Sequence, residues 1–260
     1  MNILVCIKAV PAGEMQIRID DSGRWIEAGS DDDTVMNRYD EYALEEAVRI
    51  KEHLTGTTVE VLSVGPKRCR AVIRRALAKG ADTGIHIQDP APGDPGAETV
   101  AAAIAGFCLT RAYDLILTGV ISEDLMQGLT GPLLAARLQI PCAAAVIRQR
   151  IDPDRGTVLA ACELESGWSE NIRLTLPALL TIQSGINRPR YPSLSNMMRS
   201  RHQKLITLPA DALPCVENES RITALSETAV SSCASFFEGT LEEKAEALLD
   251  LLIEKGVLIT

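Results

Sequence analysis

Apolar residues along this 260-residue chain change their pattern as the chain proceeds. Residues 2–10 (NILVCIKAV) form an apolar run that ends at Pro11, as expected of a buried strand. Short apolar runs then alternate with segments of helical periodicity. Strands are predicted at 58–64, 84–88 and 113–119, and helices at 37–54, 67–80, 97–112 and 130–139. This alternation predicts a parallel sheet with helices on both faces.

The segment between the first strand and the first helix has its own pattern. Residues 16–29 alternate apolar and polar positions around Asp21-Ser22-Gly23, which predicts a small hairpin. Asn37 is expected to cap the helix that follows, and Asp40 to support its first turn.

The pattern changes again near residue 142. Three strand-like runs at 143–152, 156–166 and 169–177 are joined by short turns, which predicts an antiparallel addition to the sheet. The run 177–183 predicts one more central strand. The stretch 207–238 is polar with little periodicity. Thr240 and Glu243 then form a capping box for a helix that has leucines on one face and ends at Gly256.

Composition narrows the function classes. A net charge of −9 argues against a nucleic-acid partner. The seven cysteines form no C-x-x-C pair, and with three histidines they do not predict a metal cluster. Most of the cysteines lie in apolar or small-residue runs and are interpreted as small core residues in a reducing compartment. With no signal peptide and no apolar run of about 20 residues, the expectation is a cytoplasmic protein without membrane insertion.

Ligands of open parallel sheets bind at the carboxyl ends of the strands. Four segments fall there: 6–10, 36–41, 64–66 and 119–132. In the last, Thr130-Gly131 opens a helix, whose free amides suit a phosphate, although an ordinary turn explains the same residues. Glu123 and Asp124 either orient sugar hydroxyls or face water.

Other candidates for chemistry are weaker. No nucleophile motif surrounds Ser63, Ser122 or Ser184. His86 is interpreted as structural, and His53 and His202 as solvated. The acidic runs 31–33 and 45–46 are interpreted as surface residues.

The segment 186–198 (INRPRYPSLSNMM) places Leu194 among polar neighbours in a proline-stiffened loop. Together with ILVCIKAVP, MNRYDEYALEEAVRIKE and VGPKRCRAVIRRALAKGAD, it resembles the electron transfer flavoprotein beta subunit over residues 1–208. The most specific element is P-R-Y-x-x-L-x-N-x-M.

The resemblance implies a fold and a set of partners. The fold is a parallel-sheet, Rossmann-like α/β domain, similar to the adenine nucleotide alpha hydrolases, with antiparallel additions. Residues 1–208 form the nucleotide-binding domain with a recognition loop at 184–204, and 209–260 form an arm that wraps the partner. A larger alpha subunit completes the heterodimer and holds a redox-active FAD, while this chain buries an AMP.

The same resemblance implies a role without catalysis by this chain itself. Electrons pass from an acyl-CoA-type dehydrogenase of fatty acid beta-oxidation, through FAD, to a quinone oxidoreductase or another acceptor. Leu194 anchors the dehydrogenase, with Arg190, Tyr191 and Met197 in the same docking segment. Arg190 and Tyr191 are expected to brace the loop.

The implied nucleotide contacts fall in the four strand-end segments. They are Cys6, Asn37, Arg38, Tyr39, Asp40, Val64, Ile121, Ser122, Glu123, Asp124, Gln127, Gly128, Thr130, Gly131 and Pro132. Contacts at Cys6 and Val64 are expected through the main chain, and core packing is compatible with them.

The 119–132 loop departs from the family pattern G-[KR]-Q-[AS]-x-D-x-D followed by Q-[TV]-G. Apolar residues replace four polar ones, at Val120, Ile121, Met126 and Leu129. The loop therefore binds AMP by other contacts, binds something else, or is empty. Two alternatives stay open: an electron-bifurcating subunit with a second FAD, which the apolar loop disfavours, and a stand-alone adenine-nucleotide sensor or hydrolase.

Overall fold

The computed structural model describes residues 1–13, 18–27, 34–89, 95–213, 222–227, 234 and 236–258. By its internal contacts the chain divides into two compact units, Met1–Leu225 and Ser226–Thr260. The acidic run 31–33 and the cysteines at 215 and 233 lie outside the described residues.

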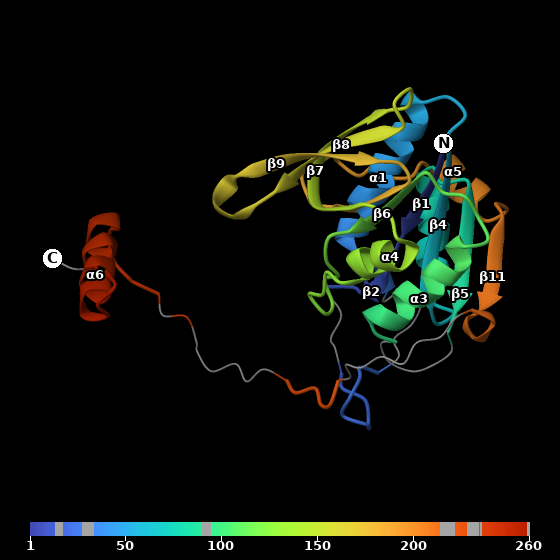
Figure 1. Ribbon diagram of the computed structural model, residues 1–260. Coiled ribbons are helices and arrows are strands. Elements are labelled where there is room, and N and C mark those ends of the chain that lie inside the picture. The colour runs from blue at the N-terminus through green and yellow to red at the C-terminus, as the bar shows by residue number, and fades with distance from the viewer. Residues whose placement is uncertain are drawn as a thin grey trace. The chain divides into compact units, whose positions relative to one another are not determined.

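A nine-stranded sheet forms the centre of the first unit (Figure 1), in the order β11-β5-β4-β1-β6-β10-β7-β8-β9. Its strands are β1 (Asn2–Cys6), β4 (Thr58–Gly65), β5 (Thr83–Gln88), β6 (Leu115–Gly119), β7 (Cys142–Asp152), β8 (Thr157–Glu163), β9 (Ser169–Thr175), β10 (Ala178–Ile182) and β11 (Leu205–Pro209). The strands from β11 to β7 pair in parallel, whereas β8 and β9 add antiparallel strands at one edge. Both the parallel sheet and its antiparallel addition were predicted.

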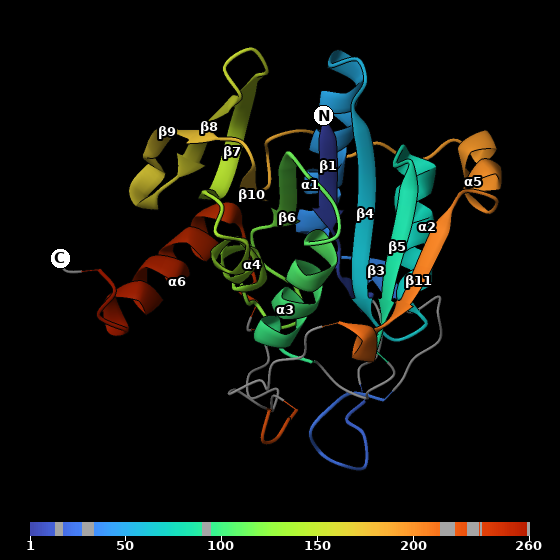
Figure 2. The same cartoon turned by 45° about the vertical axis from the view of Figure 1, so that its right-hand side comes forward.

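Helices cover both faces of the parallel strands. Figure 2 shows α3 (Ala97–Cys108) and α4 (Thr130–Leu138) on one face, and α1 (Arg38–His53) and α2 (Cys69–Lys79) behind the sheet. Alternate residues of β1 pack in opposite directions: Ile3 and Val5 lie in the core under α1 and α2, and Leu4 in the core under α3 and α4. The prediction of a Rossmann-like α/β fold is therefore confirmed.

Two strand predictions need correction. The run 2–10 is not one strand, because the chain leaves the sheet after Cys6 and the Lys8 amide donates to the Asp40 carboxylate (2.6 Å). The following β2 (Ala9–Pro11) pairs with β3 (Thr34–Met36) in a separate two-stranded sheet. The stretch after residue 207 was expected to be aperiodic, yet β11 extends to Pro209 beside β5.

The helix of the second unit begins as predicted. α6 spans Leu241–Glu254, and both bonds of the capping box are present: the Glu243 amide donates to the Thr240 hydroxyl, and the Thr240 amide donates to the Glu243 carboxylate. None of the α6 residues is buried. Leu241, Leu248, Leu249 and Leu251 are exposed, and Leu252 is half-buried. Among the described residues of this unit, no other helix or strand covers the apolar face of α6.

The remaining features of the described residues set limits on other functions. Cys6, Cys69, Cys108 and Cys162 are buried free thiols, as expected of core residues. Among the described residues, no group of side chains has the composition of a metal site, and no helix combines the length and apolarity needed to span a bilayer.

Candidate functional site

The carboxyl ends of β1, β4 and β6 lie side by side, because β1 pairs in parallel with both of the other strands. The chain runs from β1 towards β4 and β5, and then returns to β6 on the other side of β1. Such a reversal of strand order creates the usual ligand crevice of open α/β sheets. Cys6, Val64 and Gly119, at or next to the ends of their strands, all lie at this edge.

Asp40 joins the two strand ends that flank the reversal. Its buried carboxylate accepts hydrogen bonds from the Lys8 amide just after β1 and from the Gly119 amide at the end of β6 (2.9 Å). Burial raises the pKa of Asp40 from 3.8 to about 7, and the two amides oppose that rise. A Cβ atom at Gly119 would lie 2.7 Å from Tyr39 Cβ, so this position has no room for a side chain.

Asn37, at the N-cap of α1, links the helix to the 119–132 loop through its side chain. Its side-chain amide donates to the Ile121 carbonyl (2.9 Å), and its side-chain oxygen accepts from the Glu123 amide (3.1 Å). Asn37 occupies the N-cap position of α1, as predicted, but its side chain makes no cap hydrogen bond. Asp40 lies in the first turn of α1, as predicted, and its carboxylate also connects the two strand ends.

The acidic residues of the loop have protein partners. Asp124 forms an ion pair with Lys8 (2.8 Å), and the Glu123 carboxylate accepts from the Arg38 amide (3.0 Å). The Lys8 partner was missed, since nothing in the sequence relates residues so far apart. These contacts fix the near side of the loop against β1 and α1.

The start of α4 lies at the same edge of the sheet, next to the ends of β6 and β10. Gly131 is buried, and a Cβ there would lie 2.7 Å from the Thr118 hydroxyl and 2.8 Å from Thr181 Cγ2, so the helix start approaches β6 and β10 closely. The first amides of a helix lack partners within it and carry partial positive charge, which suits a phosphate. The structure thus brings the predicted residues Cys6, Asn37–Asp40, Val64 and 121–132 to one edge.

Two of the apolar replacements in the loop face solvent. Met126 is 68% exposed and adopts a left-handed conformation (φ 52°), and Leu129 is 52% exposed. Ser122 and Gln127 close the turn between them through backbone hydrogen bonds, and Gly128 and Pro132 are exposed. The loop therefore presents apolar side chains where the family pattern has polar ones.

His86 supports the end of β4 from the neighbouring strand. It is fully buried, its Nε2 donates to the Gly65 carbonyl (2.9 Å), and its Nδ1 accepts from Arg70 Nε (3.4 Å). Burial lowers the pKa of His86, so the ring is held neutral. This agrees with the structural interpretation of His86.

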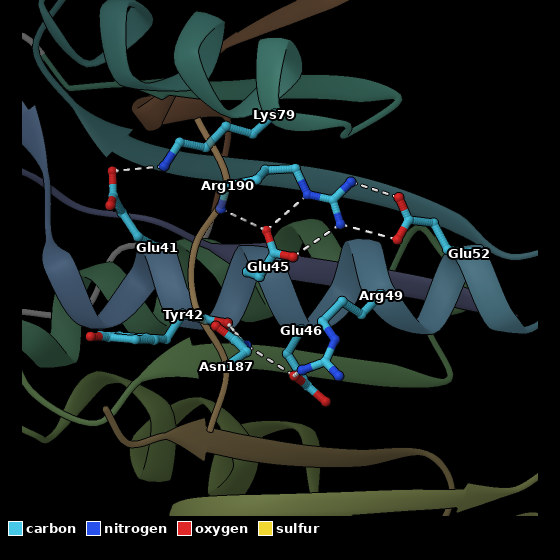
Figure 3. A network of polar contacts seen from close by, with 9 residues as sticks. All are labelled: Glu41, Tyr42, Glu45, Glu46, Arg49, Glu52, Lys79, Asn187 and Arg190. Atoms are coloured by element: carbon cyan, nitrogen blue, oxygen red, sulfur yellow. Dashed lines mark hydrogen bonds and ion pairs between the residues drawn. The ribbon is translucent and has the colours of Figure 1, made fainter. Parts of the chain in front are cut away.

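The 184–204 loop presents the second candidate surface. Leu194 begins a short helix, α5 (Leu194–Ser200), and is 77% exposed, so it does not fold back into the core. Met197 is half exposed. Tyr191 is 95% exposed, which contradicts its expected bracing role. Arg190 does brace the loop, since it bonds to Glu45 and Glu52 of α1 (Figure 3).

The contacts between the 184–204 loop and α1 correct another expectation. Glu45 and Glu46 were interpreted as surface residues, but both are buried, because the loop covers them. Glu46 accepts from Asn187 (2.9 Å) and from Gln149 on β7 (2.9 Å). The only signal in the sequence was a pair of glutamates among the buried positions of α1.

The fold and the strand order at its carboxyl edge define a Rossmann-like α/β protein. The family model of the electron transfer flavoprotein domain matches residues 25–213. The chain is 32% identical to the electron transfer flavoprotein subunit beta of Methylophilus methylotrophus (98% of both chains), and 31% to that of Bacillus subtilis (100% of both). The human subunit is 33% identical over 79% of this chain and 80% of its own. The chain therefore belongs to the electron transfer flavoprotein beta subunit family.

Proposed function

We propose that this chain is the beta subunit of a heterodimeric electron carrier and is not an enzyme by itself. Its partner is a larger alpha subunit that holds most of the FAD, and the bound FAD supplies the redox chemistry. The observation that carries the proposal is the exposed Leu194 on a loop braced by buried carboxylates. An apolar anchor on a rigid loop suits a partner that binds and then leaves.

The proposed donor is an acyl-CoA-type dehydrogenase of fatty acid beta-oxidation, and the acceptor is a quinone oxidoreductase or another carrier. Leu194 enters a hydrophobic pocket of the dehydrogenase, while Tyr191 and Met197 contact its rim. Arg190 does not contact the dehydrogenase but attaches the loop to Glu45 and Glu52 of α1. Burying a single leucine contributes about 1.5–3 kcal/mol, which strengthens the affinity of a transient complex by roughly 10- to 150-fold.

We further propose that the strand-end crevice holds AMP. Thr130 and the first amides of α4 fit a phosphate, and the main chain at Cys6 and Val64 faces the base. The sugar lies near Asp124, whose carboxylate keeps lone pairs beyond its contact with Lys8. The exposed Met126 and Leu129 supply apolar contacts in place of the family's polar groups.

The proposed domain division assigns residues 1–208 to the nucleotide-binding domain and 209–260 to an arm that binds the alpha subunit. The proposed arm is supported by α6, because this helix carries several leucines and none of its residues is buried. An amphipathic helix with an exposed apolar face needs a partner to cover it.

The test of docking uses the complex of this chain with its alpha subunit and FAD. Leu194→Ala is expected to lower kcat/KM for reduction by an acyl-CoA dehydrogenase by about tenfold or more, since it removes an interface anchor. The matched control is Leu109→Ala, because Leu109 is 80% exposed at the end of α3 on the opposite face of the sheet. An equal kcat/KM for Leu194→Ala and the unaltered complex would contradict the proposed role of Leu194 in docking.

A further inference from the structure

We propose that Glu45, together with Glu52, is a positioning residue for docking: it holds Arg190, and through Arg190 it fixes the loop that presents Leu194. The inference rests on the docking role proposed above. It assigns a function to side chains that never touch the dehydrogenase.

The contacts of Arg190 with α1 use most of its donors. Glu45 Oε2 accepts from the Arg190 amide (3.0 Å) and from Nε (2.9 Å), and Glu45 Oε1 accepts from Nη2 (2.9 Å). Glu52 accepts from Nη1 (2.6 Å) and Nη2 (3.0 Å). Figure 3 shows the guanidinium lying along α1 between the two carboxylates. These hydrogen bonds raise the pKa of Arg190 and lower that of Glu52.

The geometry of α1 places both carboxylates where one guanidinium can reach them. Glu45 and Glu52 are seven residues apart, about two turns, and therefore lie on the same face of α1. The planar guanidinium can bridge them, whereas a lysine ammonium at the same position cannot engage both in the same way. Glu45 is buried, so losing Arg190 would leave a buried charge without its partner.

The loop is fixed at two further points. Before Arg190, the Asn187 side chain donates to the Tyr42 carbonyl (3.0 Å) and to Glu46 (2.9 Å). After α5, Arg74 of α2 donates to the carbonyls of Ser200 (2.6 Å) and Gln203 (2.8 Å). The loop therefore spans from α1 to α2 with charged or polar contacts at each end, while its middle remains exposed.

The residues that hold the loop in place are different from the residues that are exposed for contact with the partner. Tyr191, Leu194 and Met197 are exposed, while the residues that hold the loop face α1 and α2. A loop held in its binding conformation before the encounter loses less conformational entropy on binding. Weakening the attachment should therefore raise the concentration of complex needed for half-maximal rate, and leave the rate at saturation unchanged.

The experiment measures turnover of an acyl-CoA dehydrogenase at saturating acyl-CoA, with the FAD-loaded complex as the varied electron acceptor. Glu45→Gln is expected to raise KM for the complex roughly three- to tenfold with kcat unchanged, because the loop must be ordered on binding. Arg190→Lys, which keeps the charge but loses the bridging geometry, is expected to do the same. FAD content and Tm establish that each variant is folded.

The matched control is Glu41→Gln. Glu41 lies on the same helix and pairs with Lys79 of α2 (3.0 Å) instead of the loop, so it repeats the charge change without touching Arg190. KM for this variant should equal that of the unaltered complex. In the Leu194→Ala background, Glu45→Gln should add little, because its effect acts through the same loop.

Loop order is measured separately by hydrogen exchange over residues 187–200. Glu45→Gln is expected to speed exchange there and Glu41→Gln to leave it unchanged. An unchanged KM or unchanged exchange in folded Glu45→Gln, or an equal KM rise in Glu41→Gln, overturns the positioning role. The docking function requires that Leu194→Ala raises KM. An unchanged KM for Leu194→Ala, together with faster exchange in Glu45→Gln, would contradict the docking function but would still show that Glu45 holds the loop in place.

Discussion

Several polar residues have a role that their local sequence does not indicate. Asn37 and Asp40 match the pattern of a helix start. Their side chains nevertheless form hydrogen bonds with residues that are 32 to 86 positions away in the sequence. Local preference and tertiary contacts compete for the same side chains, and here the tertiary contacts prevail. Sequence reasoning placed both residues correctly at the start of α1 but did not predict the partners of their side chains.

Asp40 gives a prediction for pH dependence. Its pKa is raised from 3.8 to about 7 by burial, so between these values the folded chain keeps a proton that the unfolded chain has lost. The contribution of Asp40 to stability is therefore complete below about pH 4 and is lost as the pH rises to about 7. The expected slope reaches about 1.4 kcal/mol per pH unit in that window.

Asp40→Asn removes this titration, and other groups such as His86 are common to both proteins. Urea unfolding at a series of pH values from 4.5 to 8 measures the difference in free energy of unfolding between the two. That difference should move in favour of the variant as the pH rises. A difference independent of pH would show that Asp40 does not titrate in this range.

The elements with strong local signals were predicted well. The capping box of α6, the glycine at the end of α2 and the alternation of buried strands and amphipathic helices all follow from short-range rules. β11 was missed because five residues ending in proline carry little periodicity, and its stability comes from pairing with β5. Burial of Glu45 and Glu46 depends on residues more than 140 positions away.

The apolar face of α6 is predicted to bind the alpha subunit. Replacing Leu248 and Leu252 together with serine should weaken co-purification with the alpha subunit by about tenfold or more, because two apolar contacts are lost. The matched control replaces Glu246 and Asp250 of the same helix with serine. The Tm of the first unit should be unchanged in both, since α6 belongs to the other unit. Unaltered co-purification of the leucine variant would show that this face does not bind the alpha subunit.

At the scale of the molecule, α1 joins the two candidate surfaces of the first unit. Its first turn holds the strand ends and the 119–132 loop through Asn37 and Asp40, and its middle holds the 184–204 loop through Glu45 and Glu52. The sheet sets where the crevice lies, and the helix sets where the docking loop lies. The family and the fold could be predicted from the sequence, whereas this arrangement required the tertiary contacts.

The central proposal is that this chain is one half of a flavin carrier that also binds a nucleotide. The most direct measurement is to co-express the chain with its alpha subunit, denature the purified complex, and quantify the released small molecules by chromatography and mass spectrometry. One FAD and one AMP per heterodimer are predicted. Two FAD per heterodimer, or FAD without any nucleotide, would contradict the assignment of AMP to the crevice, and the absence of a flavin-containing complex would contradict the proposed function.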